Sequence, residues 1–260
     1  MKQKQLDLLA EELLEAQNEL HTVLPLTERY PEISIDDAYY IQNTITQKRV
    51  QSGQRIVGRK IGLTSVAMQE MFGVNEPDYG TLYDFYLNQN GGVLDLKRMI
   101  QPKIEAEIGF LLKEDIQGEN ITPFQFLQSC GGVFPCIEIV DSRIVGWKIK
   151  IQDTIADNAS SGCLFLGPVM YNPLNIDYRV LGLAMYKNDK LQATAAGAAV
   201  LGDPVYASAW LANKMLQYGE SLKKGDIILS GSLIGAFSAI SGDSIVAIFD
   251  RIGTVAFSIR

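Results

Sequence analysis

The chain of 260 residues has very little histidine and cysteine, which excludes several kinds of site. His21 is the only histidine, the three cysteines are Cys130, Cys136 and Cys163, and no CxxC pair occurs. A zinc site of cysteine and histidine ligands therefore cannot be assembled. A Ser-His-Asp triad is excluded unless His21 serves it, and His21 falls where an N-terminal helix is expected to end. Three cysteines in apolar or small-residue contexts favour a reducing compartment over a disulfide framework.

Long apolar runs and an excess of basic residues are also missing. No stretch approaches the roughly 18 apolar residues of a transmembrane helix, and no apolar segment follows the first residues as in a secretory signal. The net charge of −7 disfavours nucleic acid and anionic membranes as partners. We therefore expect a soluble, cytoplasmic protein. Its hydrophobic content of 47% is sufficient for a sizeable core without metal or disulfide cross-links.

The periodicity of the first 54 residues predicts a small helical lobe. Leucines recur at helical spacing over residues 4–20. A second helix is expected to begin at Ser34, capped together with Asp37, and to end at Gly53. The length of the chain suits one large domain beside such a lobe. We therefore predict a helical lobe over residues 1–54 and a β-rich catalytic domain over residues 55–260.

The pattern changes at Ile56. A short apolar stretch over residues 56–63 is followed by an expected helix that starts after Thr64 or Ser65 and ends at Gly73. Turn residues over 75–80 predict a loop.

Strands dominate beyond residue 100, with two helices among them. Each helix has a capping residue followed by proline: Thr122-Pro123, with its end at Gly131-Gly132, and Asp203-Pro204, with its end at Gly219. The chain closes with strands expected over residues 226–230, 244–250 and 254–259.

Acidic residues interrupt two of the expected strands. In a strand over residues 103–112, Glu105 and Glu107 would share one face, roughly 7 Å apart. Glu138 stands in an otherwise apolar segment. A half-exposed, solvated strand is one explanation. Convergence on a hard cation such as Mg²⁺ or Mn²⁺ is the other, because a buried carboxylate without a partner is costly.

Two further clusters carry polar groups. Lys60 lies between Gly58 and Gly62 in a short apolar strand, and is either a surface lysine with a buried stem or a buried amine with a function. The small polar residues over 157–162 follow Asp153 and are either a turn or helix cap or part of a site.

Taken in order, several segments resemble the 2-oxopent-4-enoate hydratase branch of the fumarylacetoacetase superfamily. That branch also contains 2-oxohept-4-ene-1,7-dioate hydratases and 4-oxalocrotonate decarboxylases. The resemblance runs almost from end to end at natural spacing, and its segments are GRKIGLT (58–64), EPDYGTL (76–82), QPKIEAEIGF (101–110), IEIVDSRI (137–144), DTIADNASSG (153–162), AAVLGDP (198–204), WLANKM (210–215) and GDIILSGSL (225–233).

The resemblance implies a site. Carried over residue by residue, it makes three glutamates the ligands of Mg²⁺ or Mn²⁺, with catalytic and substrate-binding residues around them. The ligands are Glu105, Glu107 and Glu138; the catalytic residues are Lys60, Asp78 and Ser160; the substrate-binding residues are Asn158, Leu63 and Thr64. Members often have histidine where this chain has Asp203, so a substrate-binding histidine is excluded at that position.

The resemblance also implies a fold and a reaction. The fold is α+β, a mixed, rolled β-sheet domain preceded by the helical lobe, usually in a homo-oligomer. The enzyme is a hydro-lyase that converts 2-hydroxypenta-2,4-dienoate to 4-hydroxy-2-oxopentanoate, late in the meta-cleavage of aromatic compounds. The decarboxylase and the dioate hydratase of the same branch are alternatives, and a metal-free binding protein on the same fold is an alternative of another class.

Overall fold

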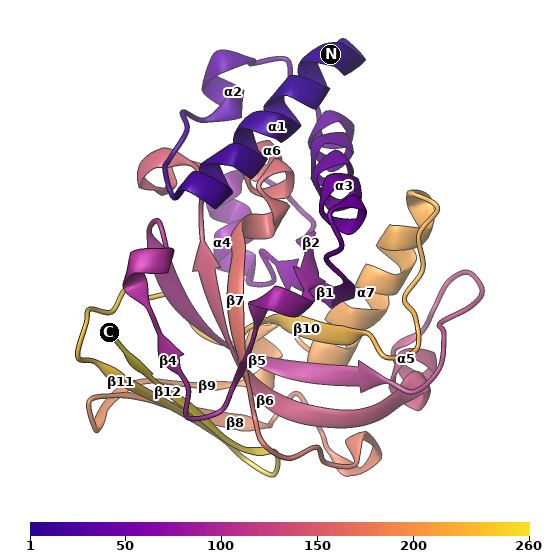
Figure 1. Ribbon diagram of the computed structural model, residues 1–260. Helices are drawn as coiled ribbons and strands as arrows, with labels where there is room; N and C mark the ends of the chain where they lie inside the picture. The colour runs from indigo at the N-terminus through magenta and orange to yellow at the C-terminus, as the bar shows by residue number, and fades with distance from the viewer.

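Two curled, mixed β-sheets form the body of the protein (Figure 1). The structure, a computed structural model, describes the backbone of residues 1–260 and every side chain except those of Ala67, Met71 and Phe72. The larger sheet has the order β2-β1-β10-β5-β6-β7-β3, with β1 parallel to β10 and β3 parallel to β7. Its strands are β1 (Ile56–Gly62), β2 (Asp78–Tyr83), β3 (Leu87–Gln89), β5 (Pro102–Leu112), β6 (Cys130–Asp141), β7 (Ser161–Leu166) and β10 (Ile227–Ser232).

The smaller sheet has the order β4-β12-β11-β8-β9. It is antiparallel except for the short β4, which runs parallel to β12. Together the two sheets confirm the expected α+β class with a mixed, rolled sheet. The strands are β4 (Val93–Leu94), β8 (Gly182–Lys187), β9 (Lys190–Ala196), β11 (Ser244–Phe249) and β12 (Gly253–Ile259).

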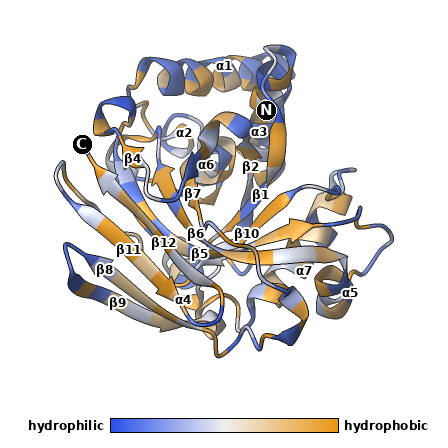
Figure 2. Ribbon diagram, turned by 60° about the horizontal axis from the view of Figure 1, so that its bottom comes forward, coloured by the Kyte–Doolittle hydropathy of each residue, from blue (hydrophilic) through white to orange (hydrophobic). Residues whose placement is uncertain are grey.

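Three N-terminal helices and one from the middle of the chain gather on one side of the larger sheet (Figure 1). They are α1 (Gln3–Glu19), α2 (Leu26–Arg29), α3 (Ile35–Gln51) and α6 (Ile151–Ala156). The buried side chain of Gln42 on α3 donates to the carbonyls of Tyr79 and Ile155, which joins α3 to β2 and α6. Hydrophilic and hydrophobic residues alternate along α1 in Figure 2, and its buried leucines join one hydrophobic cluster that continues into both sheets. The division at residues 54 and 55 into two domains stays a prediction.

Local signals for most helix ends are confirmed. Ser34 and Asp37 form a reciprocal capping box on α3, and Ser65 caps α4 (Val66–Phe72), which ends at Gly73 in a left-handed conformation. Asp203 accepts a hydrogen bond from the backbone of Val205 and caps α7 (Pro204–Gln217).

Two boundary predictions are wrong. The Gly131-Gly132 pair does not end the helix α5 (Pro123–Ser129), because β6 has already begun at Cys130. Both glycines lie within β6 instead. The expected loop over 75–80 is also too long, because β2 begins at Asp78.

The closing strands β10, β11 and β12 match their expected positions to within about two residues, which is the usual uncertainty of strand ends. Among the described residues, no helix combines the length and the apolar character needed to cross a membrane.

Candidate metal centre and active-site pocket

Three glutamates meet on one face of the larger sheet. Antiparallel pairing sets Glu105 of β5 directly opposite Glu138 of β6, and alternation along β5 places Glu107 on the same face. One carboxylate oxygen from each lies within 4.8 Å of the others. On the opposite face, Ile104 and Ala106 are buried in the hydrophobic core. The paired strands β5 and β6 therefore keep their apolar faces in the core while they bring three acids together on the other face, so the solvated-strand explanation does not hold.

Two of the acids are buried and incompletely satisfied, whereas Glu105 is half-buried. Glu107 accepts a 2.8 Å hydrogen bond from the Gly231 amide at Oε2, and Glu138 accepts a 3.0 Å bond from Ser161 at Oε1. Glu107 Oε1 lies buried without a hydrogen-bond donor among the described residues, and Glu138 Oε2 has an ion-pair contact with Lys60 in place of a hydrogen bond. Burial, with repulsion from Glu138, raises the pKa of Glu105 to about 7 and that of Glu107 well above its usual value.

Such a cluster is unfavourable without a cation. Like charges directly opposite on neighbouring strands repel, and a buried carboxylate oxygen without a donor costs free energy. Carboxylate oxygens are the ligands that Mg²⁺ and Mn²⁺ prefer. The donor-free oxygen of Glu107, the close approach of the three carboxylates and the all-oxygen donor set therefore fit a hard divalent cation held by Glu105, Glu107 and Glu138.

Lys60 lies beside this cluster and is only 2% exposed, so it is not a surface lysine. Its Nζ is 3.2 Å from Glu138 Oε2. Burial alone would lower the pKa of Lys60, but Glu138, Glu105, Glu107 and Asp78 together raise it above the usual value. The ammonium is therefore kept charged in a buried position next to the acids.

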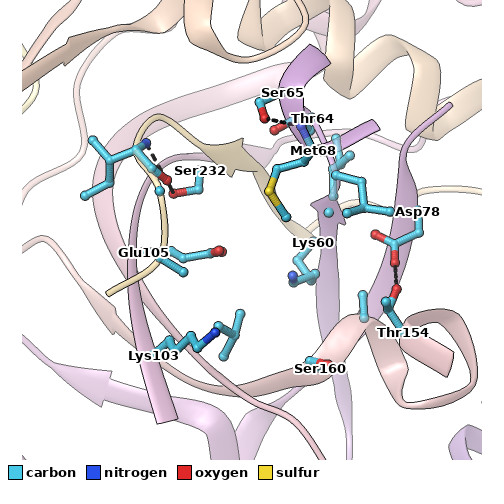
Figure 3. A pocket seen from close by; sticks show the side chains of 18 of the residues that line it. Lys60, Thr64, Ser65, Met68, Asp78, Lys103, Glu105, Thr154, Ser160 and Ser232 are labelled. Atoms are coloured by element: carbon cyan, nitrogen blue, oxygen red, sulfur yellow. Dashed lines mark hydrogen bonds between the residues drawn. The ribbon is translucent and has the colours of Figure 1, made fainter. Parts of the chain in front are cut away.

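A cavity of about 360 Å³ opens onto Lys60 and Glu105. Its size is that of a small-molecule site. In Figure 3, Glu105 and Lys103 project into it from one side, while Lys60, Asp78 and Ser160 lie around the other. Leu63 and Thr64 also line it, and much of the remaining wall is apolar, with Val140, Ile149, Leu233 and Ile234.

Asp78 opens β2 at the edge of the cavity. Thr154 of α6 donates a hydrogen bond from its hydroxyl to Asp78 Oδ2, whereas Oδ1 is buried without a donor among the described residues (Figure 3). Burial raises the pKa of Asp78, although Lys60 and Thr154 act in the opposite direction. Gly62 makes this arrangement possible, because a Cβ there would meet Asp78 Oδ1 at 2.1 Å.

The polar cluster after α6 has a strained backbone. Asn158, Ala159 and Ser160 all have positive φ, at 57°, 48° and 52°. Such conformations are costly for residues other than glycine and concentrate at functional sites. Ser160 lines the cavity, and its hydroxyl donates to Asp157 Oδ2 at 3.0 Å.

Asn158 is placed differently from the other predicted substrate contacts. Its amide oxygen accepts from the Thr81 amide at 2.7 Å, and its amide nitrogen donates to the Thr81 carbonyl at 2.9 Å. Both polar atoms are therefore engaged with β2, and Asn158 is not among the residues that line the cavity. This arrangement does not support a direct substrate contact, and we assign Asn158 to holding the strained turn against β2 instead.

Leu63 and Thr64 follow β1 into the cavity wall. Leu63 has a φ of 55°, and its carbonyl accepts from the Gln69 side chain at 2.9 Å. The Thr64 side chain packs against Gly231, where a Cβ would come within 2.4 Å of it. Asp203, by contrast, caps α7 and does not line the cavity.

Sequence reasoning did not assign a role to Lys103, Trp147 or Thr154, which line the cavity. Lys103 follows from the alternation that groups Glu105 with Glu107, because it lies on the same face of the strand. Trp147 and Thr154 lie in the segment between β6 and β7, and no sequence pattern predicts their place in the cavity wall.

A buried ion pair between Arg143 and Asp157 supports the turn that lines the cavity. The Arg143 guanidinium donates to Asp157 Oδ1, to the carbonyl of Asp157 and, at 3.0 Å, to the carbonyl of Ser161. Both side chains are at most 2% exposed. Ser160 and Ser161 flank this pair, so it fixes both the strained turn and the hydroxyl that bonds to Glu138.

Asp157→Asn is expected to lower the free energy of unfolding by about 3–5 kcal/mol, because it leaves Arg143 buried without its counter-charge. Urea denaturation measures this. Asp177→Asn is the matched control: it breaks the exposed pair with Arg179 and should leave the free energy of unfolding nearly unchanged. Equal losses in the two variants would contradict a structural role for the buried pair.

Comparisons with known proteins show which family the chain is similar to. The family model for the C-terminal part of fumarylacetoacetate (FAA) hydrolases matches residues 86–260. A 2-hydroxypent-2,4-dienoate hydratase of Pseudomonas putida is 45% identical over 212 residues, 81% of this chain and 96% of that protein. A 2-hydroxyhexa-2,4-dienoate hydratase of Comamonas testosteroni is 42% identical over 244 residues, 93% and 92% of the two chains.

A solved structure is also similar. The 4-oxalocrotonate decarboxylase from Pseudomonas putida, complexed with magnesium and adipate, superposes with a TM-score of 0.97 at 35% identity. The match covers 100% of this chain and 99% of that chain.

Proposed function

The chain belongs to the fumarylacetoacetate hydrolase family, and on this premise we propose that it is a hydro-lyase that hydrates 2-hydroxypenta-2,4-dienoate to 4-hydroxy-2-oxopentanoate. The reaction would use a divalent cation, Mg²⁺ or Mn²⁺, held by Glu105, Glu107 and Glu138. The observation that carries the proposal is the cluster of three glutamates itself, with a donor-free oxygen on Glu107 and a charged, buried lysine beside Glu138. The hydratase relatives, at 42–45% identity, supply the substrate class.

The chemistry requires a negative charge to be stabilised on the C2 oxygen of the substrate. When bound, the cation would act as a Lewis acid toward the C1 carboxylate and the C2 oxygen. Lys60 is placed to donate a hydrogen bond to that oxygen or to move its proton. A proton is added at C5 as the dienol becomes a conjugated ketone. Water then adds its oxygen to C4 and a proton to C3.

Asp78 is the residue we assign to the water. Its Oδ1 is free of hydrogen-bond donors among the described residues, while Thr154 fixes the other oxygen. A carboxylate with one oxygen anchored and the other open can orient and deprotonate a water molecule. Ser160 lines the same cavity and provides a further hydroxyl.

The second candidate is a decarboxylase of 4-oxalocrotonate, favoured by the close superposition on that enzyme. A panel of substrates separates the two. We expect loss of the dienol absorbance with 2-hydroxypenta-2,4-dienoate, and 4-hydroxy-2-oxopentanoate as the product identified by NMR. Release of CO₂ from 4-oxalocrotonate at a much higher kcat/KM than dienoate hydration would establish the decarboxylase instead.

Two finer properties are part of the proposal. We propose a homo-oligomer located in the cytoplasm, as is usual for the family that the sequence resembles. Light scattering coupled to size-exclusion chromatography tests the first, and a monomer mass of 28.7 kDa in solution would contradict it.

A further inference from the structure

The cavity contains a second lysine, which no step above uses. Lys103 lies two residues before Glu105 on β5 and faces the same side. It is partly buried and lines the cavity, into which its side chain extends in Figure 3.

An aromatic ring holds this lysine in place. Lys103 Nζ lies 4.3 Å from the centroid of the Trp147 ring, within the range of a cation–π contact. Trp147 is itself fixed, because its indole N–H donates to the Gln101 carbonyl at 3.0 Å. The Trp147 ring therefore fixes the Lys103 ammonium at the cavity wall, and it does not take a proton from it.

Lys103 has no acidic partner of its own. Among the side chains that the structure describes, no carboxylate lies within 4.0 Å of its Nζ, and its ammonium donates no hydrogen bond. An ammonium has three donors, and a partly buried one without an acceptor is unusual unless a ligand completes it. The unpaired Lys103 ammonium faces the cavity.

The charges around the cavity point to the same conclusion. Glu105 and Asp78 line the cavity and Glu107 and Glu138 lie beside Glu105, so that four carboxyl groups would face two lysines and the proposed divalent cation. With Lys103 included, the positive charges of the two lysines and the cation would equal the negative charges of the four carboxylates. An anionic substrate then does not enter a negatively charged cavity. No third lysine or arginine is among the described residues that line the wall, where Val140, Ile149, Leu233 and Ile234 lie.

We propose that Lys103, held by Trp147, binds the C1 carboxylate of the substrate and makes the site selective for acids with a single carboxylate. The proposal rests on the proposed function and extends it. Lys60 then serves the C2 oxygen and Lys103 the carboxylate. A second carboxylate at the far end of the substrate would meet apolar side chains and no cation.

Calorimetry with unreactive acids tests this without turnover. The probes are 2-oxopentanoate and 2-oxopentanedioate, which differ only in the second carboxylate, titrated into protein loaded with Mg²⁺. We expect the monoacid to bind at least about tenfold more tightly than the diacid. Lys103→Met should raise the Kd of the monoacid about 10- to 100-fold, the effect of one lost charged hydrogen bond. Lys103→Arg should recover most of it.

Lys97→Met is the matched control, since Lys97 is exposed and lies on the chain just before β5. It should leave the Kd unchanged. Trp147→Leu should weaken binding less than Lys103→Met does, because the charge remains but its position is no longer fixed. In turnover, Lys103→Met should raise KM by a similar factor and change kcat by less than about threefold.

Three results would overturn the inference. One is an unchanged Kd for 2-oxopentanoate in Lys103→Met. Another is a loss confined to the diacid, which would place Lys103 at the far carboxylate. The third is a diacid that binds wild-type protein as tightly as the monoacid. Failure of the proposed function is seen separately, as an absence of hydration by a protein that still shows the Lys103-dependent binding.

Discussion

Replacing Glu138 by glutamine is expected to remove the bound divalent cation and to lower kcat by on the order of 10³-fold, since the Lewis acid contributes several kcal/mol. Glutamine keeps the size of the side chain and removes one negative charge from the cluster. Glu105→Gln and Glu107→Gln should act in the same direction. Metal content by mass spectrometry and the rate of loss of dienol absorbance are the measurements.

In the metal-free protein, removal of one of these negative charges is expected to stabilise the fold. Without the cation, Glu107 and Glu138 repel each other in a buried position. Glu107→Gln should therefore raise the melting temperature of the chelated protein, while added Mg²⁺ should stabilise the wild type more than the variant. Glu119→Gln, at an exposed position in the loop before α5, is the matched control and should change neither property. Full metal content and full rate in all three variants would refute the site.

Lys60→Met is the second change with a large expected effect, a loss of about 10²- to 10⁴-fold in kcat. Methionine keeps most of the aliphatic stem in its buried place and removes the charge and the protons. With the metal bound, the loss of the contact to Glu138 should not unfold the protein, because the cation satisfies that carboxylate. The fold and the metal content should therefore be retained.

The control for this variant is again Lys97→Met, which removes an exposed lysine from outside the cavity. The measurements are kcat, the thermal melt and the metal content of both variants. A Lys60→Met protein with normal melting, normal metal and a kcat within about twofold of wild type would exclude Lys60 from the mechanism.

Part of the glutamate cluster was predictable from the sequence because it depends on strand alternation alone. Glu105 and Glu107 share a face whatever the neighbours of β5 are. That Glu138 joins them depends on the register of β5 against β6, which sequence periodicity does not give. For that step the resemblance to a family was required, and the same is true of Asp78, which reaches the site through the pairing of β1 with β2.

Other parts of the site depend on long-range packing, and no local sequence pattern predicts them. The helix α6 has only six residues, too few for a periodic pattern, yet it brings Thr154 to Asp78. Asn158 was expected near the substrate because the resemblance matches it to the family's polar cluster, and in the structure both polar atoms of its side chain bind the backbone of Thr81. Gly131 and Gly132 were expected to end a helix, but both already belong to β6.

The most direct test of the central claim is a titration of exhaustively chelated protein with Mg²⁺ and, separately, with Mn²⁺, in the presence of 2-hydroxypenta-2,4-dienoate. The measured quantity is the initial rate at which 4-hydroxy-2-oxopentanoate forms. We predict no product without metal and a rate that rises to saturation at about one ion per chain, with no such rise in Glu138→Gln. Full hydration by the chelated protein, or saturating metal without any 4-hydroxy-2-oxopentanoate, would contradict a metal-dependent hydratase built on these three glutamates.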